Sequence, residues 1–183
     1  MKSYEQAMEL TRTISSHTAL EDPESRLFYS LCCTIPKDGT VVEIGCELGR
    51  SSSLILQASN EIGFHSYHID PFTDNPAYLD RWLDMAAKIN APHALLVMRS
   101  VDAVADIPST IDLLYVDGDH SYNGVSIDLE LYCPKVKVRG LLACHDYGRE
   151  SLPEVYRAVH DYLKDDEWDQ IEVFGTLGVW RRR

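Results

Sequence analysis

Basic residues are scarce in this sequence, and long apolar runs are absent. The 183 residues include 17 Lys and Arg against 29 Asp and Glu, so the formal net charge is −12. A field of this sign repels phosphate backbones and anionic lipid heads, and we therefore expect neither nucleic acid nor a membrane as a partner. Residues 1–16 lack the apolar core of a signal peptide, and no apolar run is long enough to cross a bilayer. These absences predict a cytoplasmic protein.

Paired cysteine motifs are also missing. The five cysteines are an odd number, have no Cys-x-x-Cys spacing and lie within apolar stretches. We expect them to be small buried side chains in a reducing compartment. They are Cys32, Cys33, Cys46, Cys133 and Cys144.

The chain shows no repeat, low-complexity tract or linker rich in Pro, Gly or Ser. Its 45% hydrophobic and 25% charged residues are an ordinary globular composition, and its length suffices for one sizeable core. We therefore expect a single domain over residues 1–183. Little length is left for an inserted lid, so a pocket here either takes a small acceptor or is closed by a second subunit of a homo-oligomer.

Short runs rich in Val, Ile and Leu alternate with segments of helical length. Runs that are apolar at every position suit parallel strands that helices cover on both faces. Ile171 to Phe174 and Leu177 to Trp180 flank a Gly-Thr pair, which is typical of a hairpin. We therefore predict an α/β fold with a Rossmann-like, doubly wound, mostly parallel seven-stranded sheet, an antiparallel C-terminal hairpin and helices on both faces. The predicted parallel strands are Thr40 to Gly45, His65 to Asp70, Ala94 to Met98, Ile111 to Asp117 and Gly140 to His145.

Apolar residues at spacings of three and four predict the helices between these strands. Pro76 and Pro153 stand where the first turn of a helix tolerates proline. About residues 1–35 should add helices that cover the active-site end of the sheet. The other predicted helices are Ser51 to Ala58, Pro76 to Ile89, Tyr122 to Tyr132 and Pro153 to Leu163.

The ends of the predicted strands are the places to search for chemistry, because ligands of open α/β sheets bind beyond the carboxyl ends of the strands. After the first strand, residues 43–51 read Glu-Ile-Gly-Cys-Glu-Leu-Gly-Arg-Ser, a turn with two glycines followed by a helix start. Glycines let a backbone approach a ligand closely, and a helix N-terminus offers unpaired N–H groups to an anionic group such as a carboxylate. A tight turn that binds nothing would show the same Gly-x-x-x-Gly spacing.

With its acid at Glu43, this segment resembles motif I of class I S-adenosylmethionine-dependent methyltransferases. Its spacing is similar to that of the catechol O-methyltransferases and the related macrolide and sugar O-methyltransferases. Further segments resemble that family in the same order: residues 68–72 its second strand end, 113–122 its fourth strand and 140–147 its fifth. The resemblance covers about residues 39–161. It implies S-adenosylmethionine as cofactor and methyl transfer to a hydroxyl of a sugar, polyketide or phenol.

The resemblance also implies which residues bind the cofactor. Asp70 matches an acid that binds the ribose hydroxyls in the family, and a carboxylate is a natural acceptor for two hydroxyls; the alternative is a helix N-cap before the following proline. Ser51 can hold the methionine carboxylate or only cap its helix. Ser100 lies where the family places residues near adenine, although Arg99 stands where an acid is common. The predicted cofactor-binding residues are Glu43, Gly45, Gly49, Ser51, Asp70, Pro71, Phe72, Ser100 and Asp117.

Acids and imidazoles gather at the ends of the fourth and fifth predicted strands, as Asp117, Asp119, His120, His145 and Asp146. Like charges so close together are costly unless they are paired, so a cation or shifted pKa values are expected. In the resembling enzymes, magnesium is bound by an acid that matches Asp117 and by a pair that matches His145-Asp146, although the family has an acid at the position of His145. Because imidazole suits softer ions, the cluster can hold Mg²⁺ or another divalent cation, or it can be a network that orders two loops. The predicted metal ligands are Asp117, His145 and Asp146.

His120 is the predicted general base, acting beside Asp117 in the catalytic centre. It follows Asp117 by three residues, where the catechol enzymes place a basic residue and the macrolide enzymes a histidine. An imidazole with the ordinary pKa of about 6.5 can take the proton of an acceptor hydroxyl near neutral pH. The structural alternative for His120 is a cap on the helix after it.

Two other function classes stay open. The same acids and imidazoles would suit a metal-dependent hydrolase that activates water, although the HD-type phosphohydrolases carry such residues on helices. A non-catalytic module that only binds S-adenosylmethionine would share the cofactor motifs. Cofactor binding measured with and without a chelator separates these alternatives from methyl transfer.

Overall fold

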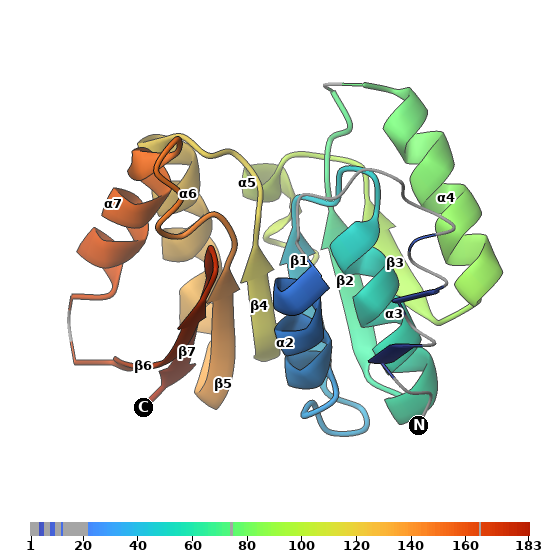
Figure 1. Ribbon diagram of the computed structural model, residues 1–183, viewed down its shortest axis with the longest axis horizontal. Helices are drawn as coiled ribbons and strands as arrows, with labels where there is room; N and C mark the ends of the chain where they lie inside the picture. The colour runs from blue at the N-terminus through green and yellow to red at the C-terminus, as the bar shows by residue number, and fades with distance from the viewer. Residues whose placement is uncertain (1–3, 6–7, 10–11, 13–21, 74, 165) are drawn as a thin grey trace.

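A computed structural model describes residues 4–5, 8–9, 12, 22–73, 75–164 and 166–183, and its sheet has the strand order β3-β2-β1-β4-β5-β7-β6 (Figure 1). Neighbours among β1 to β5 pair in parallel, whereas β7 is antiparallel to both β5 and β6. The predicted fold class and the C-terminal hairpin are confirmed, with β7 inserted between β5 and the edge strand β6. The strands are β1 (Thr40–Ile44), β2 (His65–Ile69), β3 (His93–Leu96), β4 (Ile111–Val116), β5 (Val136–Cys144), β6 (Trp168–Phe174) and β7 (Leu177–Arg182).

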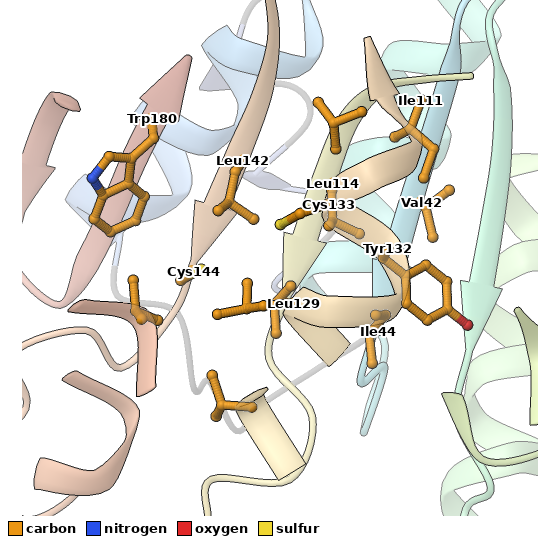
Figure 2. Packing of buried hydrophobic residues seen from close by; sticks show 14 of the residues in the cluster. Val42, Ile44, Ile111, Leu114, Leu129, Tyr132, Cys133, Leu142, Cys144 and Trp180 are labelled. Carbon is orange, nitrogen blue, oxygen red and sulfur yellow. The ribbon is translucent and has the colours of Figure 1, made fainter. Parts of the chain in front are cut away.

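Helices cover both faces of the sheet, because its strands alternate apolar side chains between two cores. Val41 of β1 packs with α2 and α3, whereas Val42 and Ile44 pack with α6 and α7. Figure 2 shows this second core, where Leu114, Leu142 and Trp180 of three strands gather with residues of α6. The helices are α2 (Asp22–Cys32), α3 (Arg50–Ile62), α4 (Ala77–Ile89), α5 (Ser100–Ala103), α6 (Tyr122–Tyr132), the 3₁₀ helix η1 (Cys133–Lys135) and α7 (Pro153–Tyr162).

Several element boundaries differ from those predicted. Strand β5 starts at Val136 and not at Gly140, because residues 137–139 are exposed and so break the apolar pattern. Helix α3 continues to Ile62, where Gly63 in the left-handed conformation ends it by donating its N–H to Ser59 O. The short helix α5 was not predicted, since four residues carry no periodicity.

The N-terminal region is only partly described: residues 1–3, 6–7, 10–11 and 13–21 of the predicted helices lie outside the described residues. Helix α2 packs beside α3 on one face of the sheet, and its first turn lies near the end of β5, where Glu24 approaches His145. All five cysteines are free thiols, and four are buried as predicted, whereas Cys33 is half-buried. Within the described residues, no helix is long and apolar enough to span a bilayer.

Candidate active site

A cavity of about 1090 Å³ lies beyond the carboxyl ends of β1, β2, β4 and β5. The cavity has this position because the strands are parallel, which brings their last residues to one edge of the sheet. Residues that the sequence did not single out also line it, among them Tyr78, Val101 and Ile127. The predicted site residues on its wall are Gly45, Ser51, Asp70, Pro71, Phe72, Ser100, Asp117, His120 and Asp146.

The turn between β1 and α3 forms one wall of the cavity. Gly45 has a φ of 87° and donates its N–H to Ile69 O at 2.9 Å, which ties the turn to β2. Gly49 has a φ of 83° and starts α3, and a Cβ there would lie 2.7 Å from Cε of Met85 in α4. Both glycines are therefore required by the backbone, but Gly49 faces α4 and does not line the cavity. Ser51 follows in the first turn of α3, where the first backbone N–H groups of a helix have no partner within that helix.

Gly45→Ala is expected to destabilise the protein more than Gly63→Ala. Both positions have nearly the same φ, 87° and 89°, so both substitutions meet the left-handed strain of about 1–2 kcal/mol. Only at Gly45 would the new Cβ overlap the backbone oxygen of Asp117, whereas the nearest atom at Gly63 is Lys37 Cγ at 3.6 Å. Urea denaturation should show an extra loss of at least about 1 kcal/mol for Gly45→Ala. Equal losses would contradict the close approach of the two strand ends.

Asp70 organises the turn as well as lining the cavity. Its Oδ2 accepts the backbone N–H groups of Cys46 at 2.8 Å and Glu47 at 3.0 Å, and its Oδ1 accepts that of Phe72 at 2.6 Å. The alternative role as a helix cap is wrong, because α4, the helix that follows, starts at Ala77 and has Pro76 as its N-cap. Two carboxylate oxygens offer about four acceptor sites, so one remains toward the cavity.

One part of the cavity wall is apolar. Val101 and Ile127 line it and are 44% and 42% exposed, so their apolar surfaces are accessible to a ligand. Ser100 donates to Oδ1 of Asp128 at 2.5 Å, and burial raises the pKa of this carboxyl to about 6. This part of the cavity wall combines apolar surface with polar groups, which suits a planar heterocycle.

Glu43 does not reach the cavity, although it was predicted to bind the cofactor. It is fully buried between β1 and α3, where Oε2 accepts Ser52 Oγ at 2.6 Å and lies 2.5 Å from His68 Nδ1. Trp82 Nε1 of α4 donates to the same Ser52 hydroxyl at 2.8 Å. Glu43 therefore joins β1, β2, α3 and α4 beneath the turn.

Asp117, His120 and Asp146 meet on another part of the cavity wall. His120 Nε2 lies 3.0 Å from Asp146 Oδ2 and 3.6 Å from Asp117 Oδ1. Arg149 Nη1 donates to Asp146 Oδ1 at 2.9 Å. The alternative role of His120 as a helix cap is wrong, because Ser121 caps α6 by accepting the N–H of Gly124. The predicted catalytic residues are thus in contact with one another.

His145 lies behind this cluster and not in it. Its side chain is 1% exposed and does not line the cavity, so the structure differs here from the predicted ligand set. Its Nδ1 lies 3.2 Å from Asp117 Oδ1, and its Nε2 lies 3.6 Å from Glu24 Oε2. Asp146, the next residue, has a φ of 56° and turns its carboxylate toward the cavity.

These contacts shift the pKa values of His120 and Asp146, as expected where several charged groups lie close together. The carboxylates of Asp117 and then Asp146 raise the pKa of His120 to about 10. Burial acts to raise the pKa of Asp146, but His120 and Arg149 outweigh it and lower this pKa to about 2. Hence His120 does not have the ordinary pKa assumed from the sequence, and without a further cation it holds its proton at neutral pH.

The donor set fits a divalent cation. One oxygen each of Asp117 and Asp146 and one nitrogen of His120 lie within 4.8 Å of one another. Two carboxylates and an imidazole suit Mn²⁺, Fe²⁺ or Zn²⁺, and the carboxylates alone suit Mg²⁺. The pKa of Asp117 is also lowered: burial would raise it, but His120 and His145 outweigh burial. Both acids are therefore ionised and able to bind a cation.

Comparisons with known proteins agree with this geometry. A family model described as a methyltransferase domain matches residues 42–147, from β1 to the loop after β5. An uncharacterized protein, R132, of Acanthamoeba polyphaga mimivirus is 29% identical over 150 residues, which are 76% of this chain and 66% of that protein. The chain thus spans just under two thirds of the length of this curated relative.

Solved structures share the fold at low identity. Cofactor-bound Rv0187 from MTB aligns with a TM-score of 0.76 and 12% identity over 98% of this chain and 88% of that one. The apo structure of CalS11, a TDP-rhamnose 3′-O-methyltransferase of calicheamicin biosynthesis, aligns with a TM-score of 0.70 and 14% identity over 97% of this chain and 93% of that one. At such identities the likeness concerns the fold alone.

Proposed function

This chain belongs to a family of methyltransferase domains, and we propose that it transfers the methyl group of S-adenosylmethionine to a hydroxyl of a small-molecule acceptor. The observation that carries the proposal is one cavity bounded by an apolar rim, the Gly45 turn with Asp70, and the Asp117–His120–Asp146 cluster. Its volume of about 1090 Å³ is at the upper end for ligand pockets, which leaves room for a cofactor and a small acceptor together.

Each part of the cavity fits one part of the cofactor. The two faces of the adenine ring are flat and largely apolar. The side chains of Val101 and Ile127 are therefore suited to pack against adenine near Ser100. The ribose hydroxyls can donate to the remaining acceptor site of Asp70. The methionine carboxylate suits the N–H groups at the start of α3, beside Ser51.

The Asp117–His120–Asp146 cluster supplies the acceptor end. In the transfer, the acceptor oxygen forms a bond to the methyl carbon while the carbon–sulfur bond breaks and sulfur keeps its electron pair. The hydroxyl proton has to leave, and we assign its acceptance to the His120 imidazole, in the fraction of molecules in which this imidazole is unprotonated. A divalent cation held by Asp117 and Asp146 would lower the pKa of the acceptor hydroxyl and orient it.

The charge of the molecule favours a small acceptor over nucleic acid. The net charge of −12 opposes binding of a phosphate backbone at any face that lacks a basic patch. Within the cavity, Arg50, Arg99 and Arg149 are outnumbered by carboxylates, which suits the positively charged sulfonium of the cofactor. We therefore place sugars, polyketides and phenols first among acceptors to screen.

Titration calorimetry with S-adenosylhomocysteine, in EDTA and then in Mn²⁺, tests the proposal. We expect binding in both buffers, and methyl transfer to at least one phenol or sugar when tritiated S-adenosylmethionine is supplied. Binding without transfer to any hydroxyl would favour a non-catalytic module. Metal-dependent hydrolysis of a phosphate ester without cofactor binding would favour the hydrolase. Absence of binding at millimolar cofactor would contradict the proposal.

A further inference from the structure

Helix α2 reaches the Asp117 carboxylate by two separate routes, although none of its residues lines the cavity. Along the first, the Phe28 ring packs on the Tyr115 ring with centroids 4.3 Å apart, and the Tyr115 hydroxyl donates to Asp117 Oδ2 at 3.1 Å. Along the second, Glu24 faces His145, and His145 contacts Asp117 Oδ1. Both oxygens of this carboxylate are therefore held from the side of α2.

Glu24 is itself fixed by the turn between β6 and β7. It is 3% exposed, and its Oε1 accepts the backbone N–H of Thr176 at 2.5 Å and the Thr176 hydroxyl at 3.0 Å. Gly175 permits this approach, because a Cβ at Gly175 would overlap Glu24 Oε1. With Oε1 engaged by the turn, Oε2 is the oxygen that faces His145 Nε2 at 3.6 Å.

His145 is equally constrained. Its backbone N–H donates to Val116 O at 3.0 Å, which holds it against the last residue of β4. Its Nε2 is buried and has no hydrogen-bond partner among the described residues, so the carboxylate of Glu24 is the group that compensates it. An imidazole held between two carboxylates has a fixed ring orientation, and carboxylates that bind a metal are themselves held by hydrogen bonds from such outer groups.

We propose that His145 and Glu24 are positioning residues: Glu24 fixes the His145 ring, and His145 holds the Asp117 carboxylate in the orientation that binds the divalent cation. The inference rests on the proposed divalent cation and adds that α2 is part of the cation site. His145 is then a support for a ligand and not a ligand itself. The resembling enzymes have an acid at this position, which binds the metal. In this chain the position is taken by His145, which contacts Glu24 of α2.

Mn²⁺ affinity measured by calorimetry, with S-adenosylhomocysteine bound, tests the role of Glu24. Glu24→Gln keeps the size of the side chain and an acceptor for Thr176 but removes the charge that faces His145. We expect about tenfold weaker Mn²⁺ binding, the lower end for loss of a group that orients a metal ligand, and S-adenosylhomocysteine affinity within about twofold. Glu154→Gln on α7, an exposed acid paired with Arg157, removes one charge elsewhere and should leave both affinities unchanged.

A second measurement does not depend on how well Glu24→Gln folds. Electron spin-echo spectroscopy of Mn²⁺ bound to the His145→Gln variant should show the same nitrogen coupling, or the same lack of it, as the unaltered protein. Loss of a coupling in His145→Gln would identify His145 as a ligand and overturn the inference. Unchanged Mn²⁺ affinity in folded Glu24→Gln would also overturn it.

Failure of the proposed function has a different signature. If the unaltered protein binds S-adenosylhomocysteine but no Mn²⁺, the inference falls together with the cation, while methyl transfer stands. If it binds neither, the proposed function is contradicted. If it binds both and only the Glu24 and His145 variants fail to behave as expected, the inference alone is wrong.

Discussion

Asp70→Ala is expected to weaken S-adenosylhomocysteine binding by about 100-fold, a loss of about 3 kcal/mol. The carboxylate is the predicted acceptor of the ribose hydroxyls, and it also holds the N–H groups of Cys46, Glu47 and Phe72. A hydrogen bond to a charged group contributes about 1.5–3 kcal/mol, and here the ribose contact and the order of the turn are lost together. Calorimetry at one pH and salt concentration measures the effect.

Asp70→Asn is the matched control for this prediction. The amide keeps one acceptor oxygen and the shape of the side chain, so it can still hold part of the turn, and we expect a loss of about tenfold. Adenosine alone should lose affinity for Asp70→Ala by a similar factor, because it contains the ribose but not the methionine portion. If Asp70→Ala binds S-adenosylhomocysteine within about threefold of the unaltered protein, the ribose contact lies elsewhere.

The sequence predicted the site's location better than its internal arrangement. Each predicted parallel strand ends near a residue that lines the cavity, because the topology rule depends only on strand direction. The burial of Glu43 could also have been predicted from the sequence. Alternation places Glu43 on the same face as Val41, and in a sheet covered on both faces that means burial. Its partners Ser52, His68 and Trp82 come from three other elements and could not be inferred from spacing.

The arrangement of His145 and Asp146 could not be predicted. The strand ends at Cys144, so the period-two rule no longer fixes which side chain faces the cavity. The φ of 56° at Asp146 redirects the chain there, and such a conformation at a non-glycine residue has no clear sequence signal. The pKa of His120 is raised first by Asp117, three residues before it, and then by Asp146, whose contact with His120 the spacing could not show.

His120→Ala is expected to lower turnover by about 10²–10⁴-fold, the usual contribution of a general base, and to leave S-adenosylhomocysteine affinity nearly unchanged. The reason for this split is the set of partners of His120, which contacts Asp117 and Asp146, the carboxylates of the proposed acceptor end. His160→Ala is the control, because His160 is an exposed histidine on α7. Transfer of a tritiated methyl group to an acceptor found by screening gives the rate.

The pH dependence gives this prediction a second readout. Because Asp117 and Asp146 raise the pKa of His120 to about 10, the base form is scarce at neutral pH and becomes more abundant as the pH rises. Turnover of the unaltered enzyme should therefore rise with pH below that value, and His120→Ala should lose the rise. Added Mg²⁺ offsets the charge of the two carboxylates, so it should move the rise to lower pH. If His120→Ala changes turnover by less than about threefold and keeps the same profile, the hydroxyl proton leaves by a route that does not use this imidazole.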